Sequence, residues 1–454
     1  MLQRLLTRLF NLERDEVAPV TAGFVLFFLL FAGYFMLRPV RETMGITGGV
    51  DNLQWLFIGT FVATLAAMPL FGWVAARVRR RRILYWVFGF FAANLAGFAL
   101  GFLARPDSVW LARTFYVWLS VFNLIAISLA WSVLVDLFAA AQARRLFGLM
   151  AAGASLGGLT GPLLGVFLVG PVGHAGLLLL SSLLLVAAMF AARRVQRWRD
   201  AHPVAEIAAG EAPDDAGRQA AMPAHRELRE APGGAARAQA GAMRDRNRPL
   251  GGSPFAGAVD VLRSPYMLGI AAFVLLLASV STFLYFEQAR LVELRFPDKH
   301  DQTRVFGTID ATVQALAIAS QLFLTGRIAQ RLGIGVLLVA VPVVAMFGFL
   351  WLALAPTFAV LAVVMVVRRA GEYAFVRPGR EMLWTSVAPQ AKYKAKNFVD
   401  TVVYRGADAV SAWAKAGVDL LAQQPAVAAL VGAGIALLWA LNGAALARMQ
   451  RRMP

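Results

Sequence analysis

Twelve long apolar stretches are the feature that most constrains how this chain can fold. Each has about 20 or more mostly apolar residues, the length that an α-helix needs to cross the hydrocarbon core of a bilayer. Charged residues make up only 15% of the 454-residue chain, against about 25% in soluble domains. The sequence therefore predicts an all-α membrane protein with twelve transmembrane helices rather than a soluble enzyme. The predicted spans are residues 17–44, 53–76, 83–104, 109–135, 146–169, 173–192, 265–290, 303–325, 334–355, 357–384, 397–422 and 426–447.

The positive charges are distributed unevenly between the two sets of loops. Thirty Lys and Arg residues fall in the termini and in the gaps after even-numbered spans, whereas six fall in the gaps after odd-numbered spans or in the adjoining ends of the spans. Cytoplasmic loops carry such an excess, so we expect a multi-pass protein of the bacterial inner membrane with both termini in the cytoplasm. The net charge of +18 then reflects topology and contact with anionic lipid, and it does not indicate nucleic-acid binding.

A long polar linker divides the spans into two groups of six. Residues 200–253 are rich in Ala, Gly, Pro, Arg and Glu and lack apolar periodicity, which is typical of disordered segments. The predicted domains are an N-terminal six-helix bundle (1–192), a cytoplasmic linker (193–264) and a C-terminal six-helix bundle (265–454). Residues 1–12 carry Leu along one helical face and are predicted to lie on the inner membrane surface.

The two groups of spans resemble each other, which indicates a duplicated six-helix unit. Tyr34-x3-Arg38-x2-Arg41 near the end of span one corresponds to Phe283-x3-Glu287-x2-Arg290 in span seven.

The loops after spans two and eight share a Gly and Arg pattern, which begins at Gly72 and at Gly326. Both loops resemble the signature loop of the major facilitator superfamily, although Ala76 and Gln330 stand where that signature has Asp. The resemblance implies two six-helix pseudo-repeats of the major facilitator type.

Small residues recur every four positions in two of the spans. In span five they are Gly153, Gly157, Gly161 and Gly165, and span eight has such a row from Gly307 onward. Rows of this kind let helix backbones approach closely. We predict that spans five and eight contact each other directly; alternatively, each row packs within its own half.

Charged side chains inside the predicted spans are costly to place in lipid and usually serve a function. Span one carries Arg38, Arg41 and Glu42. Arg38 lies about 30 Å along the helix axis from the start of the span, so it faces either a cavity or the outer interface.

Span ten is the most highly charged. Arg369, Tyr373, Arg377 and Arg380 share one broad helical face, which indicates contact with water, an anion or acidic partners. Arg suits phosphate and carboxylate because its planar fork binds them through two hydrogen bonds. Alternatively, Arg369 pairs with Glu372 while Arg377 and Arg380 lie at the cytoplasmic mouth.

Polar stripes in other spans complete the predicted site. Span eleven aligns Asp408 and Lys415, with Arg405 beside Asp408; span eight contributes Asp310, and span seven contributes Glu287 and Arg290. We infer a central, net basic, aqueous site for an anionic solute, in which the acids either carry a coupling proton or neutralise arginines. The candidate substrate-binding residues are Arg38, Arg41, Arg290, Arg369, Tyr373, Arg380, Arg405 and Lys415, and the candidate coupling or charge-balancing residues are Glu42, Glu287, Asp310, Glu372 and Asp408.

Four segments resemble one transporter family. LRPVRETMGI (37–46), DNLQWLFIGTF (51–61), QARRLFG (142–148) and AKYKAKNFVDTVVYRGADAVSAW (391–413) are similar to bacterial relatives of the ATP/ADP carriers of plastids and intracellular bacteria. The resemblance implies exchange of ATP for ADP without hydrolysis. In those carriers a first-helix pattern L-R-x-x-K-D contributes cations, so the resemblance gives Arg38 and Arg41 a candidate substrate role.

Three functions remain open from the sequence: a nucleotide or phosphorylated-metabolite antiporter, a proton-coupled facilitator of another organic anion or drug, and a non-transporting membrane scaffold. The chain has no Cys, its four His are scattered, and it lacks both a phosphate-binding Gly loop with Lys and a Ser/His/Asp constellation. We therefore predict no enzyme activity, no metal site and no cofactor. The expected partners are an anionic small molecule and lipid, and we expect a monomer.

Overall fold

A computed structural model describes residues 14–78, 80–138, 140–201, 256–387, 389–422 and 424–452. Nearly all of these residues are helical, and no strand occurs among them. The predicted amphipathic segment 1–12 and most of the predicted linker lie outside the described residues. The first half contains α2 (Val17–Ile46), α3 (Leu53–Arg77), α4 (Arg80–Ala104), α5 (Val109–Leu137) and α6 (Ala140–Ala201). The second contains α10 (Pro265–Arg295), α11 (Lys299–Ser320), α12 (Gly326–Leu354), α13 (Phe358–Gly371), α14 (Arg377–Leu383), α15 (Pro389–Phe398), α16 (Tyr404–Ala422) and α17 (Pro425–Arg451), with the short α9 (Ala256–Arg263) before it.

Two glycines mark chain reversals that the helical bounds do not show. Gly173 lies within α6 with φ +66° and Gly333 lies within α12 with φ +75°, a backbone conformation that glycine adopts without the steric cost of a β-carbon. The break at Gly173 divides α6 into predicted spans five and six. Most of the predicted gap 326–333 is instead helical, because span eight continues through a π-helical turn, η4 (Gln321–Thr325), into the first residues of α12, and the chain reverses only at Gly333.

Eight helical stretches in the described chain are long and apolar enough to cross a membrane, and two of them, Arg145–Ala201 and Lys299–Leu354, have double length. The predicted spans ten and eleven are not among the eight. They correspond to α13–α14 and α15–α16, each interrupted by a π-helical turn, η5 (Glu372–Val376) and η7 (Val399–Val403). Their charged side chains make them less apolar than the other spans. The all-α membrane class is confirmed.

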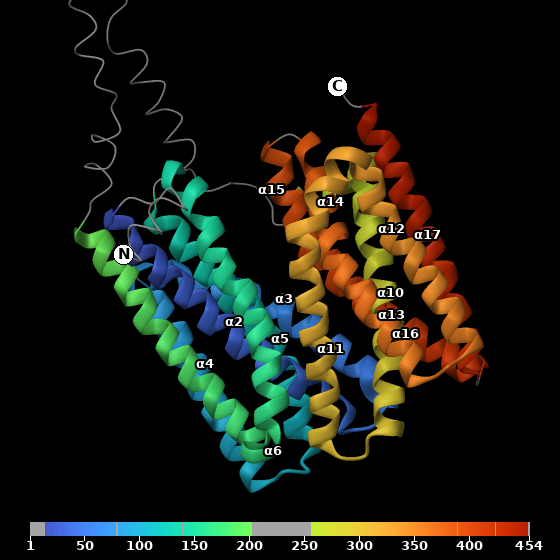
Figure 1. Cartoon of the computed structure of the whole chain (residues 1–454), viewed down its shortest axis with the longest axis horizontal. Helices are drawn as coiled ribbons and strands as arrows, with labels where there is room; N and C mark the ends of the chain where they lie inside the picture. Colours follow the sequence, from blue (N-terminus) through green and yellow to red (C-terminus); the bar gives the residue numbers. More distant parts are fainter. Residues whose placement is uncertain are drawn as a thin grey trace, which may run out of the picture.

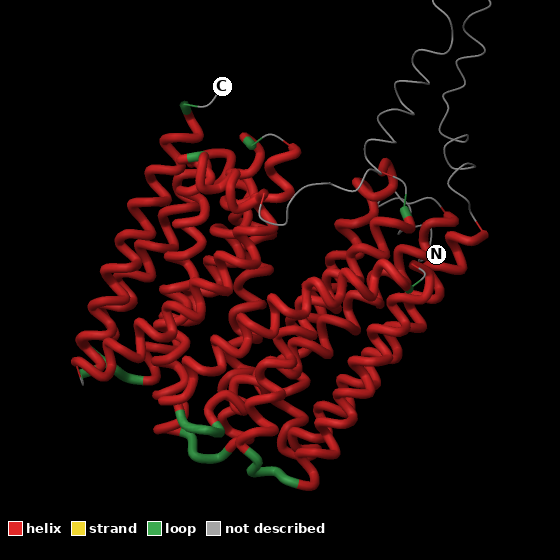
Figure 2. Tube along the Cα trace, turned by 180° about the vertical axis from the view of Figure 1, so that it is seen from behind, coloured by secondary structure: helices red, strands yellow, loops and turns green. Residues whose placement is uncertain are grey.

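The helices form two bundles that touch at one end and diverge toward the other (Figures 1 and 2). Each bundle has its own apolar core, one built from α2 and α4–α6 and one from α10, α12, α13 and α17. Both ends of the described chain lie at the diverging end, which we call the terminal end (Figure 1). The opposite end, with the turns at 47–49, 105–108 and 296–298, is called the loop end.

Contacts between the halves close the loop end. The buried hydroxyl groups of Thr43 in α2 and Thr303 in α11 lie 2.8 Å apart, and His174 Nε2 lies 2.9 Å from the same Thr303 oxygen. At the surface, Lys299 Nζ donates to Asp107 Oδ1 at 2.8 Å, which lowers the pKa of that carboxyl. A third apolar cluster, with side chains from both halves, fills the space between these contacts and the centre of the molecule.

The glycine row of span five faces its own half, so its predicted role in the contact between spans five and eight is wrong. A β-carbon on Gly153, Gly157 or Gly161 would overlap the backbone of α2 at Phe24, Phe28 or Ala32. The contact between spans five and eight nevertheless exists, through other positions of α6. Gln314 of α11 packs on Gly158, and Gly307 packs on Pro162 and Val166.

Candidate functional site

Two adjoining cavities lie between the halves. The larger, which we call the vestibule, has a volume of about 520 Å³ and is lined by side chains of α2, α5, α6 and α11 together with Gln321, Tyr373, Arg377 and Arg405. The smaller, which we call the deep cavity, has a volume of about 200 Å³ and lies closer to the loop end. Both are lined by Arg38, Arg41, Tyr373, Arg377 and Arg405, so these five side chains form the boundary between them.

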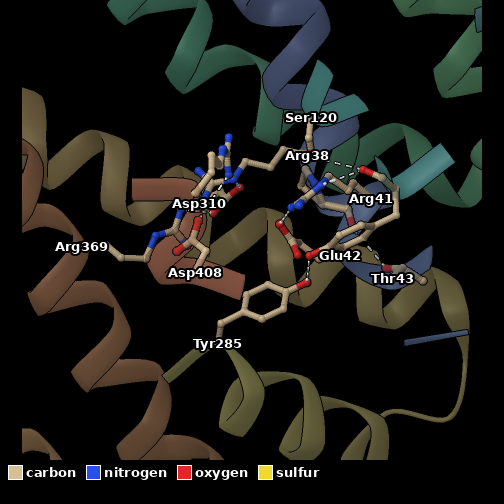
Figure 3. Close-up of polar contacts among 12 residues, drawn as sticks. Arg38, Arg41, Glu42, Thr43, Ser120, Tyr285, Asp310, Arg369 and Asp408 are labelled. Carbon is tan, nitrogen blue, oxygen red and sulfur yellow. Dashed lines mark hydrogen bonds and ion pairs between the residues drawn. The ribbon is translucent and has the colours of Figure 1, made fainter. Parts of the chain in front are cut away.

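Asp310 joins arginines from the two halves. Its Oδ1 lies 2.6 Å from Nη2 of Arg369 in α13, and its Oδ2 lies 3.7 Å from Nε of Arg38 in α2. Figure 3 shows these three side chains pointing toward one another. Asp310 is 4% exposed, so this carboxylate depends on its two guanidinium partners to offset the cost of burying its charge.

Glu372 is shared in the same way within the second half. Arg368 Nη1 donates to its Oε2 at 3.1 Å, and Arg377 Nη2 lies 3.5 Å from its Oε1. Arg368 also donates to Ser281 Oγ at 2.8 Å. The alternative pairing of Arg369 with Glu372 is therefore wrong: in the helix, Arg368 precedes Glu372 by one full turn and Arg369 points toward α11.

Arg41 is held by aromatic and acidic groups of the deep cavity. Its Nη1 donates to Glu42 at 2.8 Å, its Nε donates to the backbone oxygen of Tyr116, and its guanidinium lies 3.8 Å from the centroid of the Tyr116 ring. The Tyr116 hydroxyl in turn donates to Tyr285 at 3.1 Å. A cation over an aromatic face gains from the ring quadrupole, so Arg41 is fixed in place.

Arg405 and Asp408 of α16 form a further pair, with Arg405 Nη1 3.4 Å from Asp408 Oδ2. Thr282 of α10 also donates to Asp408. This pair lies on the second half, and Arg405 reaches both cavities.

Tyr373 lies in the π-helical turn η5, at the centre of the boundary. Arg38 Nη1 donates to its hydroxyl at 3.4 Å, and the Arg377 guanidinium lies 4.2 Å from its ring centroid. A π-helical turn leaves backbone carbonyls without their usual partners. Gln321 Nε2 and Thr325 Oγ1 from η4 donate to the carbonyl oxygens of Tyr373 and Ala374 at 3.0 and 2.9 Å. These two hydrogen bonds link the π-helical turns η4 and η5.

The structure brings most of the predicted site residues together, but four of them lie elsewhere. Arg380 pairs with Asp400 at 3.3 Å and lines neither cavity. Asp400 belongs to the π-helical turn η7 and binds the Arg380 guanidinium outside both cavities. Glu287 pairs with Arg290, and Lys415 pairs with Asp419; Glu287 and Lys415 line a third, much smaller cavity inside the second half. The residues of the prediction that line the deep cavity are Arg38, Arg41, Glu42, Asp310, Arg369, Glu372, Tyr373, Arg405 and Asp408.

Several residues of the site were missing from the predicted set. Arg377 was placed on the correct face of span ten but was not among the candidates, and Arg368 was overlooked beside Arg369. Tyr116 and Tyr285 carried no sequence signal, because an aromatic residue in an apolar span is usually part of the core. In the described part of the chain, no group of three His, Asp or Glu side chains has the arrangement of a metal site.

Comparisons with known proteins agree with this architecture. Residues 20–395 match the family model described as the Major Facilitator Superfamily. No curated protein matches the chain. Three solved structures are similar in fold: a bacterial homolog of the human lysosomal transporter Spinster in an inward-facing and unoccupied conformation (TM-score 0.56, 14% identity, 96% of each chain covered), the nucleoside transporter NupG (0.60, 14%, 94% of this chain and 98% of that one), and a POT family transporter in complex with a thioalcohol-conjugated peptide (0.61, 9%, 93% and 94%). At these identities the likeness shows the fold alone.

Proposed function

The chain belongs to the Major Facilitator Superfamily, and on that premise we propose that it carries an organic anion across the bacterial inner membrane by alternating access. It is a multi-pass membrane transport protein of the facilitator fold, rather than an enzyme.

One observation carries the proposal. Four arginines line the vestibule, Arg38 and Arg41 from the first half and Arg377 and Arg405 from the second, and no Asp or Glu is among its described lining residues. A cation cluster that faces water between two halves attracts anions, and guanidinium groups bind phosphate or carboxylate through paired hydrogen bonds. Since both halves contribute, a bound anion would contact both of the bodies that move.

Nucleotide exchange is the form of anion transport that we propose first. The LRPVRE and KAKNFVDTVVYRG segments resemble the nucleotide-carrier family, and NupG, which has a similar fold, is a nucleoside transporter. Phe31, Tyr34 and Phe35 line the vestibule next to the arginines, and aromatic side chains of this kind stack on nucleobases.

Proton-coupled uptake of another organic anion is the second candidate. Asp310 favours it, since this buried carboxylate is shared between Arg38 of one half and Arg369 of the other, and buried carboxylates inside membrane spans often mark proton relays. The scaffold hypothesis predicts no sealed cavity and no solute flux, and two polar cavities lined by both halves favour a transporter over it.

The orientation of the protein also belongs to the proposal. The vestibule lies toward the terminal end, and the excess of positive charge predicts that both termini are cytoplasmic. The structure would then represent a state open to the cytoplasm, in a protein that works as a monomer.

Counterflow into proteoliposomes tests the proposal. Liposomes loaded with unlabelled nucleotide should accumulate labelled nucleotide through the wild-type protein without a pH gradient. Arg38→Gln and Arg377→Gln should each lower the rate about tenfold or more, because each removes a cation from the vestibule. Arg295→Gln is the matched control, since Arg295 is exposed and lines neither cavity. Unchanged anion transport in both vestibule variants would refute the proposal, and transport that requires a pH gradient would favour the second candidate.

A further inference from the structure

We propose that the central site is matched to a ligand with two negative charges at one end and a flat apolar ring at the other. This inference rests on the proposed anion transport and goes beyond it, because it limits the charge of the substrate. A nucleoside monophosphate has this chemistry, whereas a nucleoside triphosphate carries too much negative charge.

The first step is the balance of formal charge. Six arginines and four carboxylates line the two cavities, which leaves two positive charges without a carboxylate. Two arginines are neutralised individually: Arg41 by Glu42 and Arg405 by Asp408. The other four share two carboxylates.

At each of the two shared carboxylates, one arginine is closer than the other, and the more distant arginine carries the excess positive charge. At Asp310, Arg369 is the close partner at 2.6 Å and Arg38 is the distant one at 3.7 Å. At Glu372, Arg368 is close at 3.1 Å and Arg377 is more distant at 3.5 Å. The close partners are buried and do not line the vestibule, whereas Arg38 and Arg377 do.

Arg38 and Arg377 approach the same side chain, that of Tyr373. Both contact Tyr373, Arg38 through the hydroxyl and Arg377 through the ring face. The two incompletely neutralised guanidinium groups, one from each half, therefore converge on a single place at the floor of the vestibule. A group with two negative charges, such as a phosphate monoester, would satisfy both at once.

Aromatic side chains of the vestibule provide a binding surface for the flat apolar ring of the ligand. Phe31 and Phe35 of α2 stack on each other with ring centroids 6.1 Å apart and line the vestibule. Phe31 precedes Arg38 by seven residues, which is about 10 Å along the helix. A ring separated from the anionic group by a short spacer would reach this aromatic pair, and stacking on it is favourable for any flat base.

The test compares ligands that share the adenosine group and differ in their negative charge. Binding of adenosine, the methyl monoester of AMP, AMP, ADP and ATP to the purified full-length protein is measured at pH 8, where they carry charges of about 0, −1, −2, −3 and −4. AMP should bind about tenfold or more tightly than either adenosine or ATP, as expected for coupling between close charges. Inorganic phosphate alone should bind more weakly than AMP, because it lacks the ring.

Two charge variants test the same balance independently. Asp310→Asn raises the excess to three positive charges and should increase the affinity for ADP relative to AMP about tenfold. Arg377→Gln lowers the excess to one positive charge and should increase the affinity for the methyl ester of AMP, a phosphodiester with one negative charge, relative to AMP by a similar factor. Arg295→Gln should leave both ratios unchanged.

The outcomes separate this inference from the proposed function. Wild-type protein that binds ATP at least as tightly as AMP, or ratios that neither variant changes, would overturn the two-charge match while anion transport stands. Absence of binding for every charged ligand, together with no counterflow, would overturn the proposed function itself.

Discussion

Lys299 and Asp107 are the clearest single-residue contact between the halves at the surface of the loop end. Asp107 lies in the turn between α4 and α5, Lys299 is the first residue of α11, and the two pair at 2.8 Å. An exposed ion pair contributes little free energy, so this contact assists the buried threonines and aromatic side chains in closing the loop end rather than closing it alone.

The pH dependence of this contact follows from the Asp107 carboxyl. The hydrogen bond from Lys299 lowers its pKa below the ordinary value of 3.8. A carboxyl with a lowered pKa contributes its stabilisation fully above its ordinary pKa and loses it as the pH falls through the lowered value. The distance between spin labels at Arg105→Cys and Leu294→Cys should therefore be the same at pH 8 and pH 5. A lengthening over that range would contradict the prediction, and the natural absence of Cys confines the labels to the chosen sites.

Single residues of the site differ in how far the sequence could predict them. Arg38, Arg41 and Arg369 were predictable, because a charge in an apolar span is costly and needs a polar partner. The partners themselves were not: Asp310 and Arg369 are on different helices, and no periodicity within one helix indicates which residue of another lies opposite it.

At the scale of elements, the close packing of α2 on α6 is the most sharply defined contact of the first half. Glycines of α6 meet backbone atoms of α2 at three successive turns. Any added side-chain atom would force the two helices apart.

A pair of alanine substitutions on α6 tests this packing. Gly157→Ala should lower the melting temperature in detergent by several degrees, since the β-carbon would overlap the Phe28 carbonyl and overpacking costs about 1–3 kcal/mol. Gly148→Ala on the same helix meets no atom within 4 Å and should leave the melting temperature unchanged or slightly raised, because Ala favours the helix. Equal melting temperatures for the two variants would show that the helices can separate without cost.

The elements were predictable where hydropathy alone decides, and not where helix geometry changes. Apolar runs of spanning length located most of the helices, since the bilayer fixes the length that they need. The π-helical turns η4, η5 and η7 had no sequence signal. The carbonyls freed in η5 are satisfied by Gln321 and Thr325 of η4, and the pattern within one helix does not indicate such partners. The predicted position of Arg380 was wrong for the same reason, because its partner Asp400 lies on another helical segment.

At the scale of the whole molecule, the loop end is closed and the halves diverge at the terminal end (Figure 1). Alternating access requires the contact between α2 and α11 at Thr43 and Thr303 to open during each cycle. These side chains are fully buried and their oxygens are 2.8 Å apart, so the closed state brings the two helices into direct contact.

A reversible cross-link tests whether the loop end must open. In the double variant Thr43→Cys/Thr303→Cys, the sulfurs would replace hydroxyl oxygens that lie 2.8 Å apart, so we expect a disulfide to form, and oxidation should abolish counterflow. Reduction should restore it, and each single variant should transport under both conditions. Full transport with the cross-link formed quantitatively would mean that solute crosses without separation of α2 from α11.

The described lining of the vestibule has arginines and no acidic side chains, which affects anions well beyond contact distance. The side chain of Arg377 is 56% exposed and that of Arg38 is 23% exposed, so their fields extend into the water at the mouth of the protein. Anions diffusing nearby are drawn inward before they touch any residue, which raises the rate of encounter. Dissolved salt shortens the reach of these fields, to about 10 Å at 0.1 M and about 3 Å at 1 M, so the ionic strength of the solution on that side of the membrane governs how efficiently a dilute solute is captured.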